Sequence, residues 1–358
     1  MRFDYHTRYR QGFALLRHPS DWLAYGLLAV VLLALPLFAS TYLIGELGYV
    51  LILCIAAMGL MALTGFTGQV SLGHASFVAI GAYAHAWLLA QGVPFVLALP
   101  LAGVIAAVAG LVVGIPAIRV SGLYLAMVTL AFSIVVEQVI GLWRGVTGGF
   151  MGMLVETPRI FGLSLGAPRY FYYVCLIVAV LVLLALANLM RSGIGRAFTG
   201  VRDSEAAAYA LGIEVKRVKV GAFGLSAGIT GLAGALMAHH IGYLTPDAFT
   251  LLLSLDLVLI VVIGGMGSLR GAILGAVLIS FLPKGVALLK SALPDAMARQ
   301  SGLEIFVAGL VLALFVLFEP TGLNGRWLKL RALFESFPLY RRDTFRRQKT
   351  YMKSERSR

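Results

Sequence analysis

Long apolar runs recur along most of this chain and restrict its fold more than any other feature. They are roughly 17 to 25 residues long, about the length that an α-helix needs to cross a 30 Å hydrocarbon core. Backbone groups in lipid must be satisfied within the protein, and the ten-residue alternation typical of a β-barrel is absent. The sequence therefore predicts an all-α polytopic membrane bundle of about ten spans, at residues 23–39, 43–63, 75–91, 95–115, 123–141, 171–189, 220–241, 251–264, 272–289 and 303–318.

The composition agrees with an integral membrane protein. Hydrophobic residues make up 60% of the chain and charged residues 13%, whereas about a quarter of a typical soluble domain is charged. Residues 1–21 are polar and no small-residue cleavage site follows, so the first apolar run is expected to stay as an anchor. Cys54 and Cys175 both lie inside apolar runs, which favours packing residues over a disulfide or a metal site.

The net charge of +13 is concentrated outside the apolar runs. Residues 326–358 hold eleven Lys or Arg against three Asp or Glu, and residues 1–21 and 191–219 are also net positive. Basic segments beside spans are the positive-inside pattern and attract anionic lipid headgroups, so a nucleic-acid partner is not needed to explain them. We expect a basic cytoplasmic arm (1–22), a transmembrane domain (23–320) and a basic cytoplasmic tail (321–358), with both termini cytoplasmic.

One polar interruption, residues 191–219, separates two long apolar runs. Ser204 is a candidate N-cap, Glu205 complements the positive helix N-terminus, and Gly212 is a candidate stop. The pattern predicts a helix of about two turns over 205–211, roughly 10 Å long. A partner groove can close around its small alanines, with Tyr209 and Leu211 as anchors. The alternative is a short amphipathic helix that lies on the membrane.

Two Gly-rich polar segments, 64–74 and 264–271, also interrupt the apolar pattern. Polar backbone at membrane depth is tolerated only where protein or a water-filled cavity covers it, and broken helices of this kind often build a translocation path. On that interpretation Gln69, Ser71 and His74 line the path. The alternative interpretation, which we weigh equally, is an ordinary tight cytoplasmic turn. Elsewhere, glycines spaced three or four residues apart predict close helix packing within the subunit.

Ionisable residues inside the predicted spans are few. A carboxylate in hydrocarbon costs about 2.5 to 3.5 kcal/mol on insertion scales, so Glu137 and Asp256 should face the bundle interior or a wet cavity. Both are candidate path residues; for Asp256 a buried hydrogen bond between helices is slightly favoured, and Glu137 could reach the interface. No catalytic set, phosphate loop or cofactor site is present. His239 and His240 are adjacent, which favours interfacial histidines over a metal pair.

Five segments in order resemble one transporter family: residues 68–83 (GQVSLGHASFVAIGAY), 122–132 (GLYLAMVTLAF), 147–149 (TGG), 195–213 (GRAFTGVRDSEAAAYALGI) and 258–276 (VLIVVIGGMGSLRGAILGA). They are similar to the LivM-type permeases of branched-chain amino-acid ABC importers, over roughly residues 40–320. The resemblance implies a bacterial inner-membrane subunit that pairs with a LivH-like permease, two cytoplasmic ATP-binding subunits and a periplasmic or extracellular substrate-binding protein.

The resemblance also implies that the polar interruption couples the permease to an ATPase. The implied residues are Arg202, Asp203, Ser204, Glu205, Ala206, Ala207 and Gly212. Here four residues separate the Glu-Ala-Ala motif from Gly212, where the general importer pattern has three, and the later Ile-x-Leu-Pro is missing. Related permeases serve branched-chain amino acids, urea, amides or aromatic acids, so the substrate stays open. An ion-coupled secondary transporter using Asp256 or Glu137 is the alternative from another class; an enzyme is disfavoured.

Overall fold

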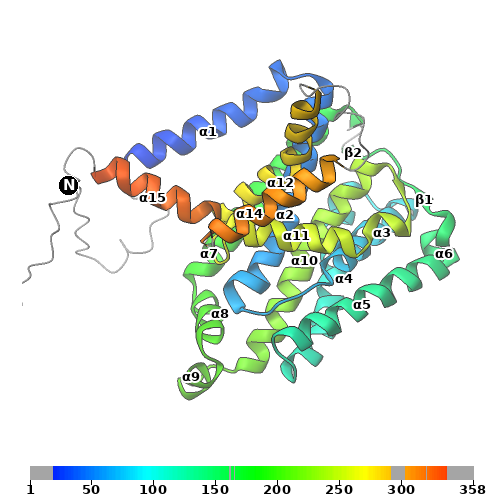
Figure 1. The fold of residues 1–358 in the computed structure, drawn as a ribbon. Coiled ribbons are helices and arrows are strands. Elements are labelled where there is room, and N and C mark those ends of the chain that lie inside the picture. Colours follow the sequence, from blue (N-terminus) through cyan, green and yellow to red (C-terminus); the bar gives the residue numbers. More distant parts are fainter. Residues whose placement is uncertain (1–18, 161–162, 165, 292–302, 320, 337–358) are drawn as a thin grey trace, which may run out of the picture.

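Each of the ten apolar runs lies in a helix of the structure, a computed structural model that describes residues 19–160, 163–164, 166–291, 303–319 and 321–336 (Figure 1). Within these residues, seven helices are long and apolar enough to cross a membrane; α1, α3 and α14 are not among the seven. The polytopic all-α bundle is therefore confirmed, and the count of ten spans stays a prediction. The ten helices are α1 (Pro19–Phe38), α2 (Thr41–Leu60), α3 (His74–Ala90), α4 (Phe95–Gly114), α5 (Leu123–Leu142), α7 (Pro168–Arg191), α10 (Val215–Ile241), α11 (Leu251–Gly264), α12 (Leu269–Ser291) and α14 (Leu303–Phe318).

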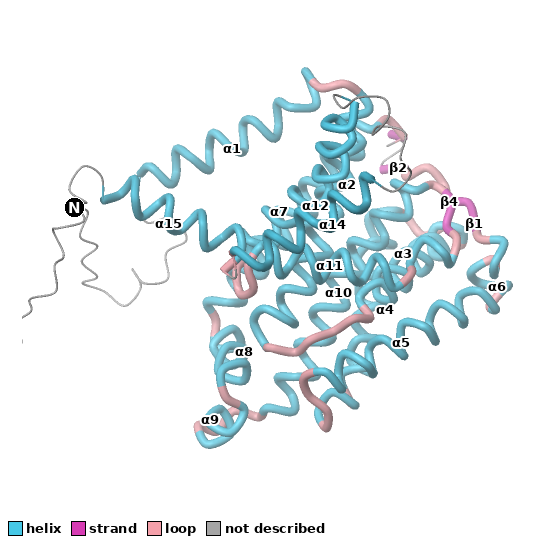
Figure 2. The backbone as a smooth tube through the Cα atoms, in the orientation of Figure 1, coloured by secondary structure: helices cyan, strands magenta, loops and turns pink. Residues whose placement is uncertain are grey.

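Short elements close the two ends of the bundle (Figure 2). Strand β1 (Met153–Leu154) pairs antiparallel with β4 (Tyr243–Leu244), and β2 (Arg159–Ile160) pairs with β3 (Leu163–Ser164). The loop between α5 and α7 is thereby tied to the C-terminal end of α10. The remaining elements are η2 (Met61–Gly65), η3 (Pro116–Ile118), α6 (Arg144–Thr147), η4 (Gly149–Met151), α8 (Gly193–Asp203), α9 (Glu205–Ala210), η5 (Pro246–Phe249) and α15 (Gly322–Ser336).

Helix α10 runs through the centre of the molecule and packs against α2, α3 and α4. Glycines allow this approach: a Cβ on Gly81 would lie 2.1 Å from the Gly231 carbonyl oxygen, and one on Gly234 would lie 2.0 Å from the Val78 carbonyl oxygen. Both distances are far inside van der Waals contact, so no larger residue fits without moving a backbone. Close glycine packing within the subunit, expected from the spacing, is confirmed.

Helices α11 and α12 form a second close pair, joined by a tight turn at residues 265–268. A Cβ on Gly275 would lie 2.1 Å from the Ile260 carbonyl oxygen, and Gly264 and Gly271 touch through their backbones. Cys54 and Cys175 are buried free thiols, as expected for packing residues.

The two predicted basic arms lie mostly outside the described residues. At the start of the tail, the Glu319 carboxylate accepts hydrogen bonds from Arg326, from Lys329 at 3.2 Å and from Thr321 at 3.0 Å. The Arg326 and Lys329 bonds lower the pKa of Glu319 to about 2. This carboxylate holds the first turns of α15 against the end of α14.

Candidate coupling site and broken helix

The polar interruption consists of parts of four helices rather than one isolated helix. Arg191 ends α7, while Lys216, Arg217 and Lys219 belong to the first turns of α10. Between them lie α8 and α9, which stand at one end of the bundle (Figure 1). Only α9 was predicted from the sequence. The N-cap of α8 is Ser192, whose hydroxyl accepts a hydrogen bond from the Ile194 N–H at 3.2 Å.

Helix α9 begins and stops where its sequence predicts. The Ser204 hydroxyl accepts the Ala207 N–H at 3.3 Å. Gly212 has a left-handed φ of 81°, and its N–H donates to the Tyr209 carbonyl at 3.0 Å, which satisfies a terminal carbonyl. Tyr209 and Leu211 are 76% and 81% exposed. The helix therefore presents large apolar side chains to its surroundings.

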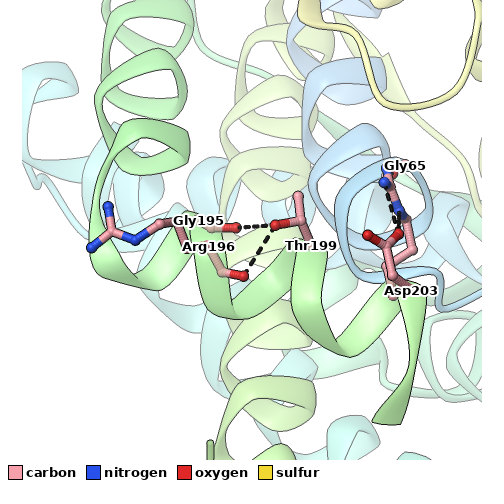
Figure 3. A network of polar contacts seen from close by, with 6 residues as sticks. Gly65, Gly195, Arg196, Thr199 and Asp203 are labelled. Atoms are coloured by element: carbon pink, nitrogen blue, oxygen red, sulfur yellow. Dashed lines mark hydrogen bonds and ion pairs between the residues drawn. The ribbon is translucent and has the colours of Figure 1, made fainter. Parts of the chain in front are cut away.

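Arg202, at the end of α8, bonds to Gly65 in η2, and Figure 3 shows Gly65 close to Asp203 at the end of the same helix. Its Nη1 donates to the Gly65 carbonyl oxygen at 3.1 Å, and its Nε and Nη2 donate to one carboxylate oxygen of Asp203 at 3.0 and 2.9 Å. The same Nη1 lies 3.3 Å from the position of a Cβ on Gly267, in the α11–α12 turn. The guanidinium thus bonds to the first Gly-rich segment and lies next to the second.

Lys219 makes the second tie, and sequence analysis missed it. Its ammonium lies 2.6 Å from the Glu205 carboxylate, and its side chain is only 5% exposed. Its carbonyl oxygen accepts a hydrogen bond from the Gln69 amide at 3.5 Å. The available signal was a lysine directly before an apolar run, which by itself looks like an interfacial anchor.

Residues 64–74 form a broken helix. Helix α2 ends in the π-helical turn η2, and extended chain then leads to α3 (Figure 2). The Leu72 N–H donates to Thr129 in α5 at 3.0 Å, and the Ala75 N–H donates to Ser254 in α11 at 2.9 Å. Both acceptors lie within their helices, so α3 starts inside the bundle. The other Gly-rich segment is a tight turn.

The three path candidates in this segment are buried among protein groups. His74 contacts the hydroxyl of Ser71 at 2.9 Å and that of Ser226 at 2.8 Å, and Ser226 donates to the Gly59 carbonyl at 2.6 Å. The Gln69 amide donates to Thr67 at 3.1 Å. These bonds pair the polar side chains of the segment with other groups inside the subunit. Their role as path residues stays a prediction.

Asp256 does not enter the bundle interior. It is exposed on α11 and forms no side-chain hydrogen bond or ion pair with the described residues, so the expected bond between helices is wrong. The reason is the helical periodicity: Ser254 and Leu257 lie on the buried face of α11, whereas Asp256 lies on its exposed face. Glu137 is half-buried near the end of α5.

His239 and His240 contact different neighbours. His239 Nε2 lies 2.9 Å from His85 Nε2, whereas the His240 ring stacks on Tyr49 with centroids 5.2 Å apart. The two imidazoles therefore do not converge on a common point. Within the residues that the structure describes, no group of three or more His, Cys, Asp or Glu could hold a metal ion.

Residues 42–317 match the family model described as branched-chain amino acid transport system / permease component, and the chain belongs to this family of membrane permeases. Among similar proteins, LivM of Escherichia coli K12, a high-affinity branched-chain amino acid permease protein by name, is 34% identical over 277 residues, or 70% of this chain and 65% of that protein. LivM of Salmonella typhimurium is 35% identical over the same shares.

The chain thus spans 65% of the length of these two relatives. A more distant relative, the autoinducer 2 import permease LsrC of Salmonella typhimurium, is 28% identical over 60% of this chain and 62% of its own length. No solved structure matches. The family consists of transport permeases rather than enzymes, and together with the spanning helices it makes the chain a multi-pass membrane protein.

Proposed function

We propose that the chain is a non-catalytic permease subunit of an ABC importer and forms part of the translocation path for branched-chain or other small apolar amino acids. It works with a LivH-like permease, two cytoplasmic ATP-binding subunits and an external substrate-binding protein. The relatives named LivM support the substrate class. Urea or amides are the alternative substrates, and LsrC, named for autoinducer 2 import, is a relative whose name gives a different small molecule. The membrane is a bacterial inner membrane, with both termini cytoplasmic by the positive-inside pattern.

The observation that carries this proposal is the arrangement of α9. The helix exposes Tyr209 and Leu211, yet its first residue is tied to Lys219 of α10 and the preceding Arg202 is tied to Gly65. A partner that binds the exposed side therefore pulls on two points inside the bundle. Such a surface fits a groove-lined ATPase that moves as it binds and hydrolyses ATP.

The substrate path in this proposal involves Gln69, Ser71, His74, Glu137 and Asp256. The first three lie in the broken helix, whose start within the bundle resembles the discontinuous helices at transporter binding sites. No cofactor is needed, because the energy comes from nucleotide bound by the partner chains.

The docking test is a double variant in which Tyr209 and Leu211 are both replaced by Asp. Both side chains are exposed, so the change leaves the subunit's own contacts intact while it places charge in the partner groove. We expect substrate uptake and co-purification with the ATP-binding subunits to be lost, with normal membrane insertion. Tyr124→Asp, at an exposed position of α5 outside α9, is the control and should keep both. Normal uptake by the double variant would overturn the docking assignment.

The ion-coupled alternative predicts a different energy source. It would use Asp256 or Glu137 as the coupling group, so dissipating the membrane gradient would stop transport while ATP remains. The importer proposal predicts that uptake survives gradient loss and stops when ATP is depleted.

A further inference from the structure

Two outer faces of the bundle differ sharply in chemistry. The exposed large residues of α4 are all aliphatic: Val96, Leu97, Leu101, Val104, Ile105, Val108, Leu111 and Val112. The face formed by α2, α11 and α12 instead carries the charged residues Glu46, Asp256 and Lys284 on spanning helices. Ionisable side chains on spanning helices usually face protein or a water-filled cavity, so this second face differs in kind from the aliphatic surface of α4.

The three charged residues and one tyrosine make up a surface that we call the polar face: Glu46, Tyr49, Asp256 and Lys284. Glu46 and Lys284 are ion-paired, with side chains 23% and 34% exposed. The Tyr49 ring is half-buried on α2, and α11, which carries Asp256, packs against both α2 and α12. Four side chains from three helices therefore share one region of the surface.

Asp256 is the incomplete member of this cluster. It is exposed and has no hydrogen-bond or ion-pair partner among the described residues, while Glu46 has Lys284. An ammonium nevertheless has three donors, so Lys284 can bind a second carboxylate beside Glu46. The exposed Leu252 and Leu255 lie one turn before Asp256 and directly beside it. The face thus offers a negative group, a positive group and an apolar surface.

We propose that the polar face borders the water-filled path and binds the backbone charges of a zwitterionic amino acid. Asp256 binds the ammonium group, Lys284 attracts the carboxylate, and Leu252 and Leu255 contact an aliphatic side chain. This assignment rests on the proposed permease function and specifies its substrate site. A partner subunit that covers the face without water is the competing arrangement, and the experiment distinguishes it.

The first measurement is cysteine accessibility in membranes that contain the complete importer. Leu255→Cys reports on the polar face, and Val104→Cys, an exposed aliphatic position midway along α4, is the matched control. The native Cys54 and Cys175 are buried and give little background. Because only the thiolate reacts, the membrane-impermeant reagent trimethylammonioethyl methanethiosulfonate should label Leu255→Cys about tenfold or more faster than Val104→Cys.

The second measurement asks which charges bind. Leucine should slow the labelling of Leu255→Cys, whereas 4-methylpentanoate, which lacks the ammonium group, should not. Adding Asp256→Asn should abolish the protection by leucine, whereas Glu156→Gln, at an exposed carboxylate in the loop between α5 and α7, should leave it intact.

Two results would overturn the inference. Equal labelling of Leu255→Cys and Val104→Cys in the complete importer would mean that lipid or a dry partner interface covers the face. The zwitterion site would be refuted if leucine and 4-methylpentanoate slowed the labelling of Leu255→Cys equally, or if neither compound slowed it. Labelling does not require transport, so loss of this inference with normal uptake leaves the permease proposal standing.

Discussion

The contact between α10 and its neighbours α3 and α4 differs in kind from the contact between α8–α9 and the bundle. The first is made of backbone against backbone, with glycines where any side chain would collide. The second depends on a few directed polar contacts, chiefly Arg202 to Gly65 and Lys219 to Glu205. A close-packed interface resists sliding, because interiors have few voids. Polar ties instead fix two points and leave the rest of α9 open.

We call the close-packed α3–α4–α10 contact the frame, and the polar contacts of Arg202 and Lys219 that tie α8 and α9 to the bundle the lever. The α3–α4–α10 contact holds the bundle together, and in the proposed importer the α8–α9 ties are the points through which a partner displaces it.

Gly234→Ala should give the largest effect, by breaking the frame. Its Cβ would lie 2.0 Å from the Val78 carbonyl oxygen, so two helices must separate, at a cost of about 1–3 kcal/mol or more. Gly221→Ala in the same helix is the control, because no atom lies within 4 Å of its added Cβ. Helix propensity should make that variant more stable by up to about 1 kcal/mol. Thermal unfolding in detergent measures both; the same sign for both would refute the close-packed interpretation.

The sequence predicted the frame better than the lever. Apolar length and glycine spacing are local signals, so the helices and their close packing could be inferred from them. The α9 cap and stop were equally local, through Ser204 and Gly212. Helix α8 was missed because its apolar positions are sparse within a charged segment. The Arg202 and Lys219 ties join residues 137 and 14 positions apart and depend on tertiary structure. Nothing in the spacing specifies them.

Arg202→Met should break the lever while leaving the frame intact. The variant keeps the aliphatic stem but loses the donor to Gly65, so uptake should fall between about fivefold and a hundredfold, the range of a 1–3 kcal/mol coupling energy. ATP hydrolysis should continue, which gives a higher ATP cost per substrate. A merely structural role would lower both together.

Arg196→Met is the matched control on the same helix. The Arg196 guanidinium donates to the Arg191 carbonyl oxygen at 3.5 Å and, within the part of the chain that the structure describes, forms no hydrogen bond to either Gly-rich segment. Its loss should leave the ratio of ATP hydrolysis to uptake unchanged. An equal fall in coupling from both variants would assign the effect to surface charge instead of the tie to Gly65.

The Lys219–Glu205 tie should respond asymmetrically. Lys219→Met leaves Glu205 half-exposed and able to reach water, so the loss of stability should be about 1 kcal/mol or less. Glu205→Ala leaves a buried ammonium without its carboxylate and should cost more. The double variant should resemble Lys219→Met. Hydrogen exchange in α9 measures the series, and additive effects would show that the two side chains do not interact.

Glu319→Gln should have the smallest effect on transport, although it removes a polar tie as strong in geometry as the others. This tie joins α14 to α15, away from α9, so it should behave as part of the frame: hydrogen exchange in α15 should rise while the ratio of ATP hydrolysis to uptake stays constant.

The low pKa of Glu319, about 2, sets the sign of its pH dependence. A depressed folded-state pKa stabilises the protein above its ordinary value near 4.5, and that contribution is lost only as the pH falls towards 2. Exchange in α15 of the native chain should therefore show no step from Glu319 between pH 5 and 8. A coupling defect in Glu319→Gln would mean that polar ties transmit force wherever they occur, and that the position of Arg202 beside both Gly-rich segments is not what makes it a lever.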